Sequence, residues 1–199
     1  PNEQPKFTID QSNVEQYKDN LSPGQVAMIE RYDDYFMPVY ETHRTAAYPQ
    51  EVMEQTVENA TEVELMKDGN GLGNYQSATP FPIPQNGLEA IWNHITRYRG
   101  GSVQRNVGQV TPTEGGEFSV VKFQDELTWR TYLADYEPGM DPNVLFYFKQ
   151  AITAPARLAG NVLLVHETID QVAEPRRAWV YNAGQRRVRR APQVAYDGP

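Results

Sequence analysis

The stretch Ser119-Val-Val-Lys-Phe-Gln-Asp-Glu-Leu-Thr-Trp-Arg-Thr-Tyr132 decides the fold, because its polarity alternates from one residue to the next. Successive side chains of a β-strand point to opposite faces, so this pattern predicts a long strand with one apolar and one wet face. Asp125 interrupts the apolar face, either as a buried polar group with its own partner or at a bulge or exposed end. The apolar face itself consists of Val121, Phe123, Leu127 and Trp129.

The segments around this strand predict a sheet built from neighbours in sequence. Short turn sequences rich in Gly and Pro separate these segments, and no helical pattern lies between them. Strands with such short connections pair antiparallel, because a parallel pair needs a long crossover. The sequence therefore predicts an antiparallel meander over residues 101–199. Besides 119–132, its strands are expected over residues 103–110, 143–152, 160–169, 177–182 and 186–190.

The first hundred residues are predicted to be mainly helical and extended. Residues 7–40 predict two short amphipathic helices, of which the second begins at Ser22-Pro23 and ends at Pro38. Residues 49–59 predict another helix, and residues 61–66 alternate like a short strand. The strongest helical pattern covers residues 86–99, with Asn86 as its cap and Gly100-Gly101 at its end. The apolar face of that helix consists of Leu88, Ile91, Trp92, Ile95 and Tyr98.

These patterns place the chain in the α+β fold class. We expect one domain over residues 1–199, because 199 residues suffice for a single sizeable core. In this prediction the helices precede a curved antiparallel sheet and pack on it.

Composition excludes several classes of function. A net charge of −8 and a pI near 4.9 argue against general binding to nucleic acid, and no apolar run is long enough to span a bilayer. The absence of cysteine excludes disulfides and thiolate chemistry. The chain begins at Pro1 without a signal-type segment, so we expect a processed protein or a part of a longer one.

Charge is distributed unevenly along the chain. Residues 175–199 carry a net charge of +5, and the remaining residues carry −13. A hairpin turning at 182–185 would place Arg177, Trp179, Tyr181, Arg186, Val188 and Arg190 on one face, and Ala178, Val180, Arg187 and Arg189 on the other. Arginine beside tryptophan would allow cation–π stacking. This basic hairpin is either a docking patch for an anionic partner or a solvated edge whose charges prevent aggregation. The residues of the candidate patch are Arg177, Trp179, Arg186, Arg187, Arg189 and Arg190.

Motifs for catalysis are absent from the sequence. The three histidines, His43, His94 and His166, lie far apart and form no metal-binding spacing, and no serine lies in a nucleophile elbow. Asp125 is the one acid that a hydrolase could be expected to use. We therefore expect a binding protein rather than an enzyme, with no cofactor and no metal.

Three long motifs resemble domain-of-unknown-function family 1329, whose members are periplasmic proteins of double-membrane bacteria. The motifs are residues 42–50 (THRTAAYPQ), 82–94 (PIPQNGLEAIWNH) with 97–100 (RYRG), and 176–192 (RRAWVYNAGQRRVRRAP). The last motif is also similar to the Trp-x-Tyr … Arg-Arg-Val-x-Arg stretch of outer-membrane lipoprotein-sorting proteins, which belong to the lipoprotein-carrier superfamily.

This resemblance implies a fold and a setting. The fold would be an incomplete antiparallel half-barrel whose concave face is covered by helices, around an apolar cavity that holds acyl chains. Family members are longer and are associated with transporters of the resistance-nodulation-division type, so the chain would be the N-terminal part of a periplasmic protein with such a partner. The family supplies no catalytic residues.

The first functional hypothesis is therefore a periplasmic lipid- or lipoprotein-handling protein, which serves as a carrier or as an accessory to an inner-membrane transporter. Contact with the membrane would be peripheral. The alternative is a protein-binding or sensor module that uses the same half-barrel and the basic hairpin. The cavity residues could instead form a filled core, as in other sheets packed on helices. The expected cavity residues are Trp92, Ile95, Val121, Phe123, Trp129, Phe146 and Phe148.

Overall fold

The computed structural model describes residues 3–43, 46–66, 68–137 and 139–191. The chain divides into two compact units, Pro1–Ala47 and Tyr48–Pro199, whereas the sequence predicts one domain over residues 1–199. Each unit has a hydrophobic core of its own, which is why the chain divides there. Residues 1–2 and 192–199 of the expected domain lie outside the described residues.

The first unit is a small α/β module. Strands β1 (Phe7–Ile9) and β2 (Met37–Val39) pair antiparallel around the 3₁₀ helix η1 (Val14–Asn20) and the helix α1 (Pro23–Arg31). The buried side chains of Ile9, Val14 and Ile29 form its core. Ser22 caps α1 in a capping box with Gln25, as the Ser-Pro sequence predicted. The helix ends at Arg31 and not at Pro38, because residues 37–39 pair with β1 instead.

The second unit begins with two helices and two strands of two residues each. Helix α2 (Gln50–Glu62) continues past the predicted end at residue 59, so the expected strand 61–66 shrinks to β3 (Glu64–Leu65), which pairs with β4 (Leu72–Gly73). Helix α3 (Gly87–Thr96) begins where predicted, since the Asn86 side chain accepts a hydrogen bond from the Glu89 backbone N–H at 3.0 Å.

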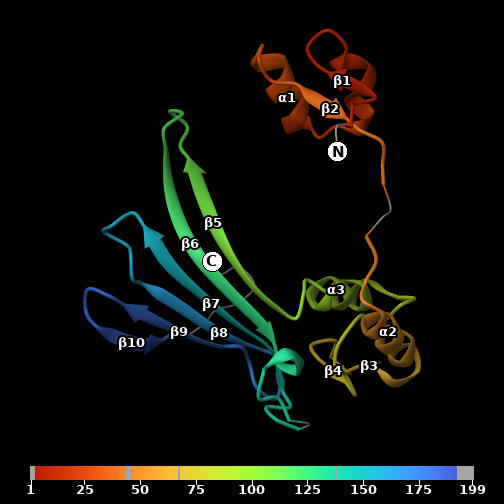
Figure 1. The fold of residues 1–199 in the computed structure, drawn as a ribbon, viewed down its shortest axis with the longest axis vertical. Coiled ribbons are helices and arrows are strands. Elements are labelled where there is room, and N and C mark those ends of the chain that lie inside the picture. The colour runs from red at the N-terminus through yellow and green to blue at the C-terminus, as the bar shows by residue number, and fades with distance from the viewer. Residues whose placement is uncertain (1–2, 44–45, 67, 138, 192–199) are drawn as a thin grey trace. The chain divides into compact units, whose positions relative to one another are not determined.

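A six-stranded antiparallel sheet makes up the rest of the second unit, as the alternating sequence predicted (Figure 1). Every strand pairs with its neighbours in sequence, and the sheet is open, with β5 and β10 at its edges. The Lys122/Phe123 step interrupts the β6–β7 register. The strands are β5 (Ser102–Pro112), β6 (Phe118–Trp129), β7 (Val144–Ala154), β8 (Val162–Thr168), β9 (Arg177–Asn182) and β10 (Arg187–Arg190).

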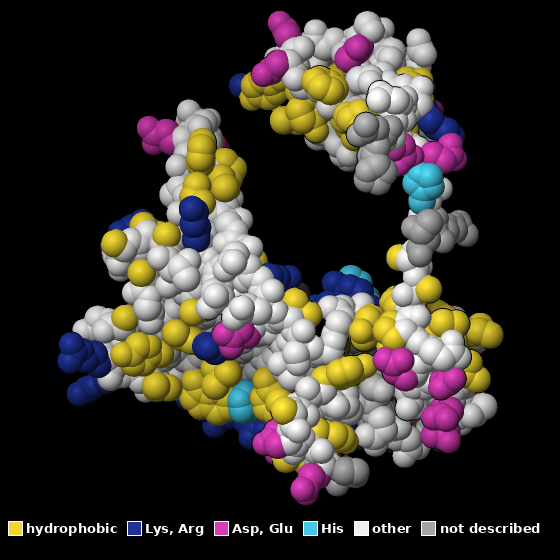
Figure 2. All heavy atoms as spheres, viewed as in Figure 1, with side chains coloured by type: hydrophobic (Ala, Val, Ile, Leu, Met, Phe, Trp, Pro, Cys, Tyr) yellow, Lys and Arg dark blue, Asp and Glu magenta, His cyan; other side chains and the backbone are white. Residues whose placement is uncertain are grey.

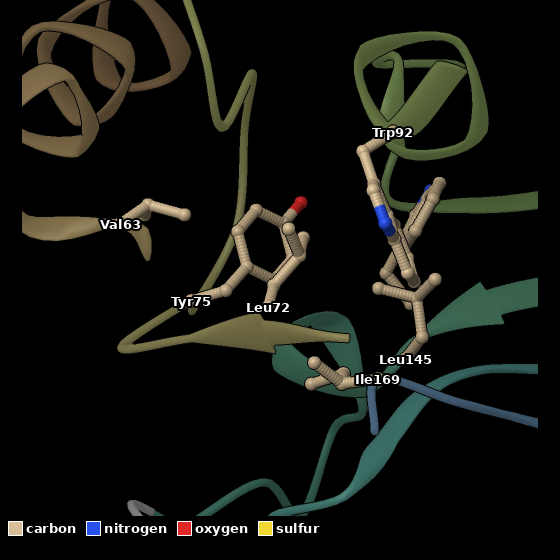
Figure 3. Close-up of a cluster of buried hydrophobic side chains, with 7 residues drawn as sticks. Val63, Leu72, Tyr75, Trp92, Leu145 and Ile169 are labelled. Carbon is tan, nitrogen blue, oxygen red and sulfur yellow. The ribbon is translucent and has the colours of Figure 1, made fainter. Parts of the chain in front are cut away.

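The core of the second unit lies where its helices meet one end of the sheet. In Figure 3, Trp92 extends from α3 toward Leu145 at the start of β7, and Ile169 and Leu72 lie below it. The Trp92 indole also donates a hydrogen bond to the Gly69 carbonyl at 3.0 Å. The complete cluster of buried side chains is Val63, Leu72, Tyr75, Trp92, Trp129, Leu145 and Ile169.

The helices therefore do not cover a face of the sheet, which corrects the expectation of helices packed on its concave face. Helices α2 and α3 lie beside the end of the sheet, and most of the β5–β6 hairpin extends away from them (Figure 1). The reason is local: in α3 only Trp92 and Thr96 are buried, so that helix contacts the sheet at one position along the strands. The α+β class and the antiparallel meander are confirmed.

Candidate ligand-binding face of the sheet

The strand register places the five predicted cavity residues of the sheet on one face. Leu127 lies opposite Phe148, Trp129 opposite Phe146, and Phe123 opposite Ile152. Because the side-chain period is two, these residues and Val121 all project to the same side. We call this side the Phe148 face. It also carries Val103, Val107, Leu163 and Val165 from the neighbouring strands.

The predicted cavity residues separate into two groups along this face. Trp92 and Trp129 are only 3% and 8% exposed and belong to the core. Phe146 packs edge-on against Trp129 with ring centroids 5.3 Å apart, and Ile95 lies against the same cluster. These four residues fill space at the end of the sheet. Farther along the strands, Val121, Phe123 and Phe148 are only partly buried, so their surfaces remain open to a ligand.

Asp125 lies in the middle of the Phe148 face. Of the two alternatives that the sequence predicted for it, the structure shows the buried polar group with its own partners. Its side chain is 4% exposed. The Arg105 Nε donates to Asp125 Oδ2 at 3.0 Å, and the Gln150 Nε2 donates to Asp125 Oδ1 at 3.0 Å. The irregular step of β6 lies at Lys122/Phe123 and not at this residue. Asp125 is thus held in register across three strands.

A recess of about 170 Å³ opens beside this aspartate. Two arginines line it, Arg99 from the segment after α3 and Arg105 from β5, together with Val103, Asp125 and Leu127. Sequence reasoning missed both arginines. A signal existed for Arg105: a hairpin centred on Gly115 places residue 105 opposite residue 125, as observed. The helix predicted over residues 86–99 ends at Thr96, so Arg99 lies in irregular chain, where the expected helical periodicity does not hold.

The opposite side of the sheet, which we call the Trp179 face, contains part of the predicted basic hairpin. Trp179 lies opposite Arg190, and Tyr181 lies opposite Val188, so these four residues share a face as predicted. Arg177 shares it too, whereas Arg187 and Arg189 project to the other side and Arg186 lies in the turn. The structure therefore divides the six candidate docking residues between the two faces and the turn.

The tryptophan on this face contacts a histidine ring. His166 lies between Tyr147 and Trp179, with both centroid distances at 4.8 Å. Burial and the nearby Arg177 lower the pKa of His166, against a smaller opposing effect of Asp141. Among the described residues, the cation–π contacts involve Tyr32 and Tyr136 and not Trp179, so the expected arginine stacking on Trp179 is absent there.

An apolar groove runs beside these rings. In Figure 2 hydrophobic side chains gather over the strands, and basic side chains lie at the tip of the β9–β10 hairpin. The groove lies over β8 to β10. On β6 and β7 the same face is polar instead, since Lys149 and Glu126 form an ion pair there at 3.1 Å. Its lining residues are Val162, Leu164, His166, Trp179, Tyr181 and Val188.

A third recess lies between α2, the end of α3 and the end of β6. Its volume is about 160 Å³, below the roughly 300 Å³ at which pockets for ligands of drug size begin. Trp129 and Tyr75 line it, and the Trp129 Nε1–H is buried with no acceptor among the described residues. Burial raises the pKa of Tyr75, whose hydroxyl donates to the Ala78 carbonyl at 2.8 Å.

The described part of the chain contains no group of three or more His, Asp or Glu side chains placed to hold a metal ion. Within residues 3–43, 46–66, 68–137 and 139–191, none of the helices combines the length and the apolar composition that a membrane span requires.

Fold and site together define an α+β protein with an open antiparallel sheet, whose long apolar face is covered by helices only at one end. The chain belongs to the family described as "Protein of unknown function (DUF1329)", whose model matches residues 8–199. It is 66% identical over 198 residues to the "Uncharacterized protein PA3922" of Pseudomonas aeruginosa, covering 99% of this chain and 44% of that protein. The chain thus spans less than half the length of this relative. No solved structure matches it.

Proposed function

We propose that the Phe148 face binds the acyl chain of a lipid or lipoprotein, and that the protein is a periplasmic carrier or an accessory to a transporter of the resistance-nodulation-division type. One observation carries the proposal: apolar side chains continue along β6 and β7 beyond the core, with Leu163 beside them on β8, and they are only partly buried. A filled core would leave such residues fully covered.

The geometry of the face suits an extended chain of methylenes. The row Val103, Leu127 and Phe148 crosses three adjacent strands, and all three side chains are only partly buried. Strands lie about 4.8 Å apart, so the row is about 10 Å long. Each methylene buried on such a surface contributes about 0.8 kcal/mol. The open antiparallel sheet also supports a relation to the lipoprotein-carrier half-barrel.

The test is native mass spectrometry of the full-length protein purified from its own envelope, followed by denaturing extraction of bound lipid. We expect a stoichiometric lipid that is lost in Phe123→Glu, since a carboxylate on the Phe148 face would have to be desolvated against the acyl chain. Lys122→Glu is the matched control, because Lys122 is the adjacent residue on the other face and should leave the lipid bound.

Affinity for a series of fatty acids gives a second, quantitative test. If methylenes are buried on the face, each extension by two carbons should tighten binding about tenfold until the row is filled. A lipid-free protein whose affinity for acyl probes does not change with chain length would refute the proposal.

A second candidate function is protein binding through the Trp179 face. The observation in its favour is the apolar groove over β8–β10, which lies beside Arg177 and Arg190 on the same face. A partner held by these arginines should dissociate as salt is raised, whereas an acyl chain should hardly respond. Cross-linking in envelope preparations at low and high salt, with Arg190→Gln as the variant, would separate the two functions.

A further inference from the structure

We infer that the ligand of the Phe148 face is an anionic amphiphile, and that Arg99 and Arg105 bind its headgroup at the start of the apolar row. This inference rests on the proposed function and adds the chemical class of the ligand and its direction on the sheet.

The first step is the charge of the recess beside Asp125. Its lining contains two arginines and a single carboxylate, so it carries an excess of positive charge. Arg99 makes no ion pair with any described residue, and its Nη2 donates only to the Ile95 carbonyl at 3.3 Å. Partial burial and the nearby Arg97 and Arg105 lower the pKa of Arg99, so an anion placed here would relieve repulsion between cations.

The second step is the orientation of Arg105. Asp125 Oδ2 accepts a hydrogen bond from the Arg105 Nε, which fixes one side of the guanidinium. The other aspartate oxygen, Oδ1, accepts from the Gln150 Nε2, so Asp125 is itself held in place. The Arg105 side chain remains 63% exposed, and neither of its terminal Nη groups has an acceptor among the described residues. A planar carboxylate or phosphate matches such a fork of N–H donors.

The third step is continuity with the apolar row. Leu127 and Val103 line the same recess as the two arginines, and Leu127 lies directly opposite Phe148. A headgroup at Arg99 and Arg105 would therefore place the first methylenes on Leu127 and the following ones on Phe148. An amphiphile needs this arrangement of charge and apolar surface, and a neutral hydrocarbon does not.

The experiment compares two ligands that differ only in headgroup charge. Oleate and oleyl alcohol displace a fluorescent fatty-acid probe from the full-length protein, at a pH where the carboxylate is ionised. We expect the parent protein to bind oleate about ten- to a hundredfold more tightly than the alcohol, the usual range for a hydrogen bond to a charged group. Arg99→Gln should reduce the affinity for oleate about tenfold and leave that for the alcohol unchanged.

Arg97→Gln is the matched control. Arg97 leaves the same end of α3 and donates to a helix carbonyl, that of His94, but it does not line the recess. Its replacement removes the same charge and should change the ratio of the two affinities by less than about threefold. Thermal unfolding confirms that both variants fold, and Arg99→Lys should restore much of the preference for oleate.

The outcomes separate this inference from the proposed function. Equal affinities for oleate and the alcohol would overturn the anionic headgroup and leave acyl-chain binding intact. Equal effects of Arg97→Gln and Arg99→Gln would show a general effect of charge and overturn the assigned site. Competition by acetate at the concentrations effective for oleate would assign the recess to free anions. Binding of neither ligand would overturn both proposals.

Discussion

At the scale of single residues, the second unit depends on a few close approaches that the alternation of polar and apolar residues does not reveal. Gly101 is one of them. A Cβ atom at this position would fall within the ring of Tyr132, whereas a Cβ at Gly108 in the middle of β5 would meet nothing within 4 Å. The junction between α3 and β5 thus requires glycine for space and not for an unusual backbone angle.

This contrast predicts different effects of the same substitution. Gly101→Ala should lower the free energy of unfolding by about 1–3 kcal/mol, because the Tyr132 ring must move. Gly108→Ala should change it by less than about 0.5 kcal/mol. Urea unfolding followed by tryptophan fluorescence measures both, and equal midpoints for the two variants would contradict the close approach.

His166 predicts a dependence of stability on pH. Its pKa is lowered in the folded protein, mainly by burial and then by Arg177, so the unfolded chain binds more protons below its own pKa of about 6.5. The stability linked to His166 is therefore fully present above about pH 6.5 and is lost as the pH falls toward the lowered value. His166→Gln should remove this part of the slope, as measured by urea midpoints between about pH 5 and 7.5. An unchanged slope in the variant would contradict the assignment.

At the scale of elements, the sequence predicted the strands of the large sheet well and the short strand pair β1–β2 poorly. The strands of the large sheet lie within three residues of their predicted ends, because short turn sequences rich in Gly and Pro mark where most of them begin and end. The pair β1–β2 was missed, since each strand has three residues and β2 contains Pro38, which usually argues against a strand. The end of α1 was misplaced for the same reason, because the pairing of residues far apart in sequence decided where the helix stops.

In the candidate site, too, local sequence patterns predicted some features, and packing between residues far apart in sequence decided others. Alternation alone placed Val121, Phe123, Phe146 and Phe148 on one face, which the register confirms. It could not show that the helices stop at the end of the sheet, because that depends on how Trp92 packs against residues that follow much later in the chain. For the same reason Arg99 was not recognised beside Asp125.

Helix α3 allows a test of this packing. Trp92→Ala should cost about 3–5 kcal/mol, because it removes the centre of the core and the hydrogen bond to Gly69. Ile91→Ala, its neighbour in the same helix with a side chain 49% exposed, should cost less than about 1 kcal/mol. Chemical denaturation measures both costs, and a similar loss in the two variants would mean that α3 packs through another face.

At the scale of the whole molecule, the two units have separate cores. The three tryptophans, Trp92, Trp129 and Trp179, all belong to the second unit. The core of the first unit consists of aliphatic residues with Tyr17 and Tyr35 packed against it. Tryptophan fluorescence therefore reports on the sheet and its helices alone.

This separation predicts that the second unit folds without the first. Deletion of residues 1–47 should leave a cooperative tryptophan transition, with an unfolding free energy within about 0.5 kcal/mol of the parent, because units with separate cores contribute independently to stability. Loss of the cooperative transition after this deletion would show that the sheet requires residues of the first unit.

The order of the strands in the large sheet also has a consequence for how the protein folds. Each strand from β5 to β10 pairs only with the strand before or after it in the chain. Loops that close over short distances lose little conformational entropy, so hairpins can form early, one after another, during synthesis. The packing of Trp92 with Leu145 and Ile169 closes much longer loops, and it is complete only after β8 has been made. The sheet should therefore assemble locally, and its docking with α3 should be the late step that limits the rate of folding.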